Sequence, residues 1–237
     1  MTEQLTPLIS VNNVSFRYNE EDDFLLKDLS FTIYKNEILG IVGENGTGKS
    51  TLFSLLNLDL SPTSGEIVYE NPELEMAQLL QKNNFNFNIP LTVEDFFLYF
   101  VPQKTNWGQE EILEILQLTK TKKQKLSDLS FGQKRRLFMA RTLLTSKADI
   151  YLFDEPLTGI DRAGQDQFLE LITILKEKFG KTIIFIEHNL SALLRQSDRV
   201  LCLGPKVHWH PKKDFTQKIL PHLYSCDYEH ILLHEKL

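Results

Sequence analysis

The segment GENGTGKST, residues 43–51, places glycines, a lysine and hydroxyl side chains at the spacing G-x-x-x-x-G-K-[ST]. It follows the apolar run EILGIVG and precedes a helical pattern, which is the context that a phosphate-binding loop requires. Glycines at such a turn let backbone N–H groups surround a phosphate at the start of a helix. We therefore expect this segment to bind a nucleoside triphosphate through Gly43, Glu44, Asn45, Gly46, Thr47, Gly48, Lys49, Ser50 and Thr51.

Two side chains of this segment have specific expected roles. Lys49 would reach the β- and γ-phosphates, and the Ser50 hydroxyl would be a ligand of Mg²⁺. The alternative is a glycine turn that precedes a helix by chance, and the strand–turn–helix context disfavours it.

A pair of acids ends another apolar run, in the sequence DIYLFDEP. Asp154 at the strand end can hold Mg²⁺ through water, and Glu155 beside the γ-phosphate can orient and deprotonate the attacking water. The alternative role for these acids is to cap the helix that follows Pro156.

The segment LSFGQKRR, residues 129–136, puts Lys134, Arg135 and Arg136 where an apolar helical pattern begins. The first turn of a helix favours acids, because the backbone dipole leaves partial positive charge there. Cations at this end suggest that an anion approaches it, and a solvated charged face is the alternative interpretation.

The elements that must position these residues alternate between strands and helices. Apolar or alternating runs predict strands at LISVNNVSFRY, LSFTIY, EILGIVG, ADIYLFDEP, KTIIFIEHN and DRVLCLG. Residues 93–146 have a helical pattern instead. This order predicts an α/β fold with a mostly parallel sheet and a helical insertion.

The bulk composition restricts the class of protein. The 237 residues carry a net charge of −6, which disfavours a general nucleic-acid binder. Two cysteines, one of them in a strand-like run, indicate a reducing compartment rather than a disulfide framework. The N-terminus lacks a signal-peptide pattern, and no apolar run reaches the length that a bilayer requires. We expect a soluble protein.

The phosphate loop, LSFGQ, YLFDEP, LTGID and FIEHN occur in this order, and together they resemble the ATP-binding cassette (ABC) ATPases over about residues 8–204. The resemblance implies a RecA-like P-loop NTPase core with mostly parallel strands, an antiparallel β subdomain and an inserted helical subdomain at about residues 82–146. Residues 205–237 would form a C-terminal extension.

In that family two cassettes stack head to tail, with the signature sequence of one facing the phosphate loop of the other. The resemblance thus implies a homodimer in which Ser130, Gly132 and Gln133 meet the ATP bound to the partner chain. Phe131 departs from the commonest family pattern, which has glycine there. We interpret it as tolerated, and tuning of dimer closure is the alternative.

The resemblance also assigns roles to single residues. Tyr18 would stack on adenine, and Gln81 would contact Mg²⁺ and the lytic water, with Gln78 as a rival position. Asp161 resembles the acid of the loop that crosses the dimer interface, and His188 resembles the histidine that contacts the γ-phosphate. Together with Lys49 and Glu155, Gln81 and His188 form the expected catalytic set.

The chain best resembles the separate ATPase subunit of a bacterial importer, because one cassette without inserted coiled coils fits neither the ribosome-associated nor the DNA-repair members. The compact spacing and the IPLTV and DRVLCLG segments look most like the zinc and manganese uptake branch. Energy-coupling importers of cobalt, nickel or vitamins and a non-transport ABC ATPase are the alternatives. The partners would be an integral-membrane permease, which would hold this chain at the cytoplasmic face of the membrane, and an extracytoplasmic substrate-binding protein.

The last 30 residues contain five of the six histidines. His230 and His234 are four residues apart, so a helix would place them on one face, where Cys226 or Glu229 would complete a divalent metal site. Ordinary surface histidines are the stronger interpretation.

Overall fold

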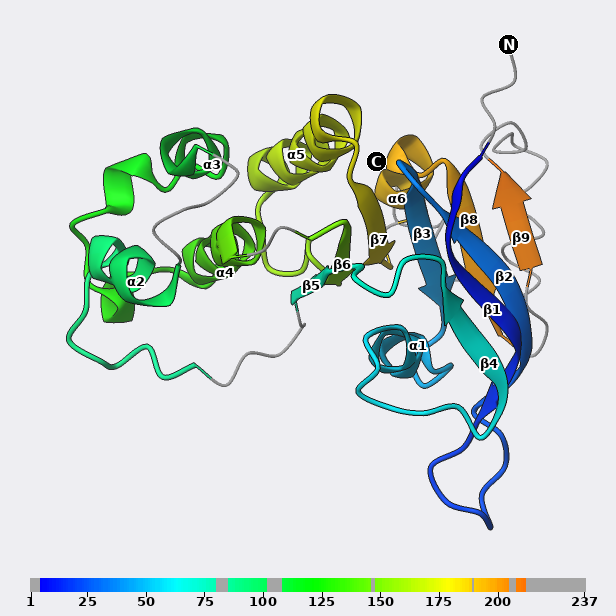
Figure 1. Cartoon of the computed structure of the whole chain (residues 1–237). Coiled ribbons are helices and arrows are strands. Elements are labelled where there is room, and N and C mark those ends of the chain that lie inside the picture. The colour runs from blue at the N-terminus through cyan, green and yellow to red at the C-terminus, as the bar shows by residue number, and fades with distance from the viewer. Residues whose placement is uncertain are drawn as a thin grey trace, which may run out of the picture. The chain divides into compact units, whose positions relative to one another are not determined.

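The computed structural model describes residues 5–79, 85–101, 108–145, 148–188, 190–204 and 208–211. The chain divides into two units, whose helices and strands are labelled in Figure 1. Unit 1 comprises residues 1–70 and 186–237, and unit 2 comprises residues 71–185. Each unit is described by itself.

Unit 1 contains an antiparallel sheet of three strands in the order β2-β1-β4 (Figure 1). The strands are β1 (Pro7–Phe16), β2 (Leu26–Tyr34) and β4 (Ser64–Tyr69). Alternating apolar residues give β1 one buried face, which includes Ile9 and Val11. This sheet is the antiparallel β subdomain that the family resemblance implies.

The phosphate loop of unit 1 is held by a second set of strands. All six residues of β3 (Ile38–Gly43) are buried, and β3 pairs in parallel with β8 (Arg199–Leu203), with Val42 opposite Cys202. The edge strand β9 (His208–Pro211) pairs antiparallel with β8. Helix α1 (Lys49–Leu56) follows the loop, and α6 (Leu190–Gln196) precedes β8.

Unit 2 contains adjacent strands in the order β5-β6-β7. Strand β5 (Met76–Leu79) is parallel to β6 (Ile150–Asp154), and β7 (Thr182–Ile186) is contiguous with unit 2 up to Phe185. Helix α5 (Arg162–Phe179) packs on β6 through Phe168, whose ring lies edge-on at 5.2 Å from that of Phe153.

The helical part of unit 2 lies between β5 and β6 in the chain (Figure 1). It contains α2 (Val93–Phe100), α3 (Gln109–Ile115), the short 3₁₀ turns at Thr119–Thr121 and Leu126–Asp128, and α4 (Phe131–Thr145). Rings from α2, α4 and the preceding segment form one aromatic cluster, with centroids 5.1–5.7 Å apart: Phe85, Phe87, Phe96, Phe97, Phe100 and Phe138. Each such pair contributes about 0.5–1.5 kcal/mol beyond its buried area.

These elements confirm the predicted class, an α/β P-loop NTPase with parallel strands, an antiparallel sheet and an inserted helical part. The predicted division at residue 204 stays a prediction, because most of residues 205–237 lie outside the described part of the chain. Among the described residues, no helix is long and apolar enough to cross a membrane.

Candidate functional site

The turn between β3 and α1 has the backbone conformation that its glycines permit. Gly46 and Gly48 have φ angles of +85° and +91°, in the left-handed region that side chains disfavour. Helix α1 then begins without a side-chain cap, because Gly48 occupies the N-cap position. The first turn therefore offers backbone N–H groups and the positive end of the helix dipole to an anion.

Lys49 lies inside this turn. Its side chain is 7% exposed, and Nζ donates to the carbonyl oxygens of Gly43 and Glu44, at 2.7 Å each. Thr47 closes the same turn by donating its hydroxyl to the Glu44 carbonyl at 3.0 Å. The ammonium group is thus fixed at the centre of the turn, where it can neutralise phosphate charge.

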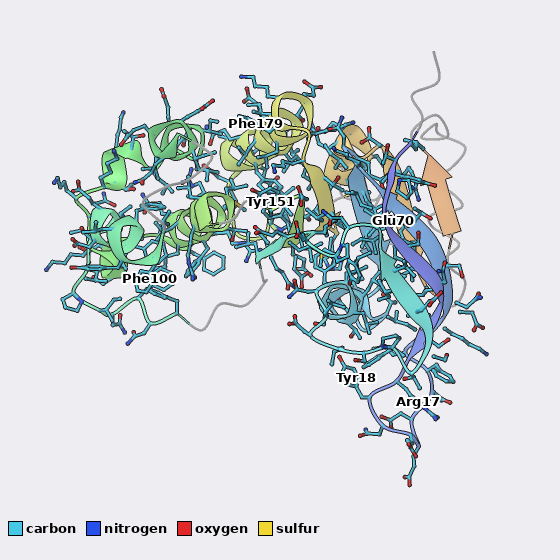
Figure 2. All side chains as sticks on the ribbon, in the orientation of Figure 1. Arg17, Tyr18, Glu70, Phe100, Tyr151 and Phe179 are labelled. Carbon is cyan, nitrogen blue, oxygen red and sulfur yellow. The ribbon has the colours of Figure 1, made fainter. Side chains whose placement is uncertain are left out.

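Tyr18 stands close to the beginning of α1. Its hydroxyl lies 3.0 Å from the Thr51 hydroxyl, and its ring packs edge-on against Phe16 with the centroids 5.0 Å apart. The residue is 62% exposed, and Figure 2 shows it on the segment that follows β1. An exposed ring tethered beside the phosphate turn is a suitable platform for a base.

His188 follows β7 and belongs to unit 1. The residue is half-buried, and its backbone N–H donates to the carboxylate of the buried Glu187 at 3.2 Å. The role of its ring stays a prediction.

Asp154 and Glu155 are at the carboxyl end of β6 in unit 2. Asp154 is buried in the last position of the strand, and Glu155 has a left-handed φ of +47°. The Glu155 carbonyl accepts from the Thr158 backbone N–H at 3.2 Å, and the Thr158 hydroxyl lies 3.4 Å from the Glu155 carboxylate. The geometry does not support the capping alternative for this pair, because the side chain that caps α5 is Asp161, which accepts from the Gly164 N–H at 3.2 Å.

The signature segment closes the start of α4 with a reciprocal pair of hydrogen bonds. Gln133 N–H donates to Ser130 Oγ at 3.2 Å, and Ser130 N–H donates to Gln133 Oε1 at 2.8 Å. This arrangement is a capping box with glutamine at the third helical position. Because Ser130 Oγ accepts from Gln133, its own hydroxyl hydrogen is directed away from that N–H group.

Phe131 has a defined place in unit 2. A Cβ atom added to Gly159 would lie 2.3 Å and 2.5 Å from two ring atoms of Phe131, so the ring rests directly on this glycine. Gly159 itself has a φ of +74°. Phe131 is nevertheless 67% exposed as a whole. Phe131 is therefore accommodated by a glycine in the LTGID segment, which the sequence did not indicate.

The three cations of α4 each have a partner within unit 2. Lys134 lies over the Phe87 ring, 4.7 Å from its centroid, and Arg136 donates to Gln117 Oε1 at 3.2 Å. Arg135 is buried and donates to two backbone carbonyls of the β6 end. Since their partners are an aromatic ring, an amide and carbonyl groups, the suggestion that these cations mark the approach of an anion gains no support.

Several other predicted residues lie outside the described part of the chain. Gln81 is one of these, as are the tail residues Cys226, Glu229, His230 and His234. The rival Gln78 lies in β5. Among the described residues, no three His, Cys, Asp or Glu side chains are grouped to hold a metal ion.

Comparisons with known proteins agree with this description. Residues 26–158 match the model of a family described as ABC transporter. Over 201 residues the chain is 36% identical to the zinc import ATP-binding protein ZnuC of Rickettsia bellii, covering 85% of this chain and 84% of the relative. ZnuC of Acinetobacter baylyi is 32% identical, with 84% and 75% covered. A solved dimeric ATP-binding cassette with bound ADP and phosphate is 25% identical, with a TM-score of 0.68 and 85% and 98% covered.

Proposed function

The chain belongs to the ABC transporter family and is an ATP hydrolase of that family, and from this premise we propose that it powers a membrane importer for zinc. The observation that carries the zinc assignment is the similarity to zinc import ATP-binding proteins, at 36% identity over 85% of the chain. Manganese is the alternative metal, and energy-coupling importers of cobalt or nickel are the next class to test.

ATP is held in this proposal by the turn between β3 and α1. The backbone N–H groups of the turn and Lys49 surround the phosphates, because they combine the helix dipole with a buried ammonium group. Tyr18 stacks on the adenine, since its ring is exposed while its hydroxyl is tethered to Thr51. His188 contacts the γ-phosphate.

Mg²⁺ fits the chemistry of the proposed ligands. Ser50 is an exposed hydroxyl in the first turn of α1, Asp154 is a buried carboxylate, and Gln81 supplies an amide oxygen. Hydroxyl, carboxylate and carbonyl oxygens are the donors that Mg²⁺ prefers. The ion, when bound, neutralises charge on the phosphate oxygens.

Glu155 is the proposed general base. Its carboxylate accepts a proton from the attacking water, and its position depends on the backbone and on Thr158, whose hydroxyl is 3.4 Å away. Lys49 stabilises the charge that develops on the phosphoryl oxygens.

The partner chain completes each ATP site in this proposal. Ser130, directed by its hydrogen bond from Gln133, donates its hydroxyl hydrogen to the γ-phosphate of the ATP on the partner. Gly132 contributes a backbone N–H, and Asp161 lies in the segment that crosses the interface. The homodimer would bind a membrane permease at the cytoplasmic face and act with an extracytoplasmic zinc-binding protein.

Replacement of the Glu155 carboxylate tests its proposed role as the general base of ATP hydrolysis. In Glu155→Gln we expect normal ATP affinity, loss of steady hydrolysis and accumulation of ATP-bound dimers, because the amide cannot accept the proton. ATP affinity is measured by equilibrium binding and turnover by phosphate release. Turnover close to that of the wild type would remove Glu155 from the role of base.

Growth under chelation tests the substrate. Cells that lack this chain should fail to grow in metal-depleted medium and should recover when zinc alone is added. The wild-type chain should restore uptake of labelled zinc, whereas Glu155→Gln should not. Recovery with manganese but not zinc would change the metal, and normal uptake of both would exclude this branch of importers.

A further inference from the structure

Arg135 is the fifth residue of α4 and points into unit 2. It is 8% exposed, and its Nη2 atom donates to the carbonyl of Asp154 at 2.7 Å and to the carbonyl of Glu155 at 2.9 Å. A buried guanidinium requires such acceptors, because desolvation of an unpaired charge is costly. One nitrogen thus links the signature helix to the end of β6.

The two carbonyls belong to the peptide groups on either side of the Glu155 Cα atom. Each peptide group is planar, so φ and ψ are the only soft torsions between them. When both oxygens are held by one nitrogen, the orientation of the two planes is restrained. Arg135 therefore restrains the backbone conformation of Glu155.

Glu155 has a conformation that needs such a restraint. Its φ of +47° lies in the left-handed region, which is strained for a residue with a side chain and persists only where the surrounding structure imposes it. Pro156 follows, and its ring favours an extended conformation for the residue before it, so the left-handed conformation of Glu155 needs another restraint. The Thr158 N–H adds a bond to the Glu155 carbonyl at 3.2 Å.

We propose that Arg135 is a positioning residue for hydrolysis, whose guanidinium holds Glu155 in the left-handed conformation that directs its carboxylate toward the attacking water. This inference rests on the proposed role of Glu155 as general base. Arg135 itself touches neither ATP nor water in this scheme. Its effect is transmitted through the two carbonyls, so that it acts on the rate of hydrolysis rather than on the binding of nucleotide.

The test uses the full chain with two substitutions of Arg135, one control substitution on the same helix, and Glu155→Gln as the reference. Arg135→Met keeps a flexible, unbranched stem and removes the hydrogen-bond donors, whereas Arg135→Lys keeps a charged donor. We expect Arg135→Met to lower kcat about 10- to 100-fold, with the KM for ATP within about threefold of wild type, since small misplacements of a catalytic group have this size of effect. Arg135→Lys should retain more activity, with kcat about three- to tenfold below wild type.

Arg141→Met is the matched control, because Arg141 lies on the same helix and is not part of the proposed site. Its kcat should stay within about twofold of wild type. A second readout is the ATP-bound dimer, which should accumulate in Arg135→Met as it does in Glu155→Gln. A general structural defect would not produce this accumulation, because it would weaken ATP binding as well.

Three results would overturn the inference. One is a kcat for both Arg135 variants within twofold of wild type, and another is a parallel loss of ATP affinity and turnover. The third is normal turnover in Glu155→Gln, which would reject both the role of Glu155 as general base and the role of Arg135. An inactive Glu155→Gln together with active Arg135 variants would reject only the role of Arg135.

If Arg135→Met fails to fold, Arg135→Lys decides the question. An unchanged kcat in Arg135→Lys would then reject the positioning role of Arg135.

Discussion

The first turn of α1 has no side-chain cap, whereas the first turn of α4 is closed by the Ser130–Gln133 capping box. Both turns are proposed to meet phosphate, one in the same chain and one in the partner. In α1 the N-cap is Gly48, and Lys49 is folded onto the carbonyls of the turn. In α4 the Ser130 and Gln133 side chains each accept a hydrogen bond from the backbone N–H of the other residue.

The difference indicates how each turn is suited to an anion. The α1 turn presents backbone N–H groups, which need close approach and therefore glycines. The α4 turn keeps its cap and presents a hydroxyl whose orientation the cap restrains. In the proposed dimer, the α1 turn would therefore surround a phosphate with backbone N–H groups, whereas the α4 turn would offer a hydroxyl that its cap has already oriented.

The largest expected effect is the loss of ATP hydrolysis when either the α1 turn or the α4 turn is disabled by a single substitution. Lys49→Ala removes the ammonium group, and Ser130→Arg places bulk and charge where we propose that the γ-phosphate of the partner's ATP docks. Each variant alone should lose hydrolysis by about 100-fold or more, as expected when a charge-stabilising donor is removed. The measurement is ATP hydrolysis at saturating ATP.

Mixing the two inactive variants sharpens this comparison. In a mixed dimer one site combines the intact Lys49 with the intact Ser130, and the other site carries both substitutions. ATP-induced dimerisation of the mixture should therefore exceed that of either variant alone, and hydrolysis should recover in part if one site turns over by itself. Dimerisation no better than that of the separate variants would reject a role for α4 across the interface.

The contact between Phe131 and Gly159 should give a smaller, structural effect. Gly159→Ala places a Cβ where the Phe131 ring lies and at a φ of +74°, so we expect a loss of about 1–3 kcal/mol in the free energy of unfolding. Phe131→Ala in the same chain should recover part of this loss, leaving a coupling energy above about 0.5 kcal/mol. Urea unfolding of the two single variants and the double variant measures it, and strict additivity would contradict the contact.

Removal of the α4 cap should lower the free energy of unfolding by less than Gly159→Ala does. Gln133→Ala loses the acceptor for the Ser130 N–H and should lower stability by about 0.5–1 kcal/mol. Gln133→Glu retains an acceptor and serves as the control. Equal destabilisation by both substitutions, measured by urea unfolding, would show that the hydrogen bond is not the cause.

The smallest expected effect is a pH dependence of stability that the α4 capping box should lack. Helix α2 also begins with a capping box, but there the acceptor at the third helical position is Asp95 instead of glutamine. Hydrogen bonds from the Thr92 side chain and backbone lower the pKa of Asp95 below its ordinary value of 3.8. A lowered folded-state pKa adds stability that is present above pH 3.8 and is lost as the pH falls through the folded pKa. The stability difference between wild type and Asp95→Asn should therefore shrink on acidification, and a constant difference from pH 7 to pH 3 would contradict this.

The positions of the motifs were predictable because each is local in sequence. The phosphate turn and the Asp154–Glu155 pair each follow a buried strand, so the sequence was sufficient to place them at strand ends. Asp161 follows in the LTGID segment, and its role as the N-cap of α5, where it accepts from the Gly164 N–H, was not foreseen.

Contacts between distant segments were not predictable in this way. The bonds from Arg135 join residues 19 and 20 positions apart, and the sequence showed only a run of three cations. Likewise, nothing local indicates that Phe131 lies on Gly159. The Ser130–Gln133 box was readable as S-x-x-Q, but its residues were interpreted as nucleotide contacts alone.

The pairing of β3 with β8 has a consequence for folding during synthesis on the ribosome. The backbone N–H of Ile38, at the start of β3, donates a hydrogen bond to the carboxylate of Asp198, just before β8. The two residues are 160 positions apart in the chain. At about 5–20 residues per second, the ribosome makes that length of chain in roughly 10–30 s. The apolar segment ILGIVG thus emerges long before its neighbour exists, while unit 2 is completed as one continuous segment. A nascent chain of this protein therefore carries an unpaired, fully apolar strand through most of its synthesis, and that strand is where chaperone binding is expected.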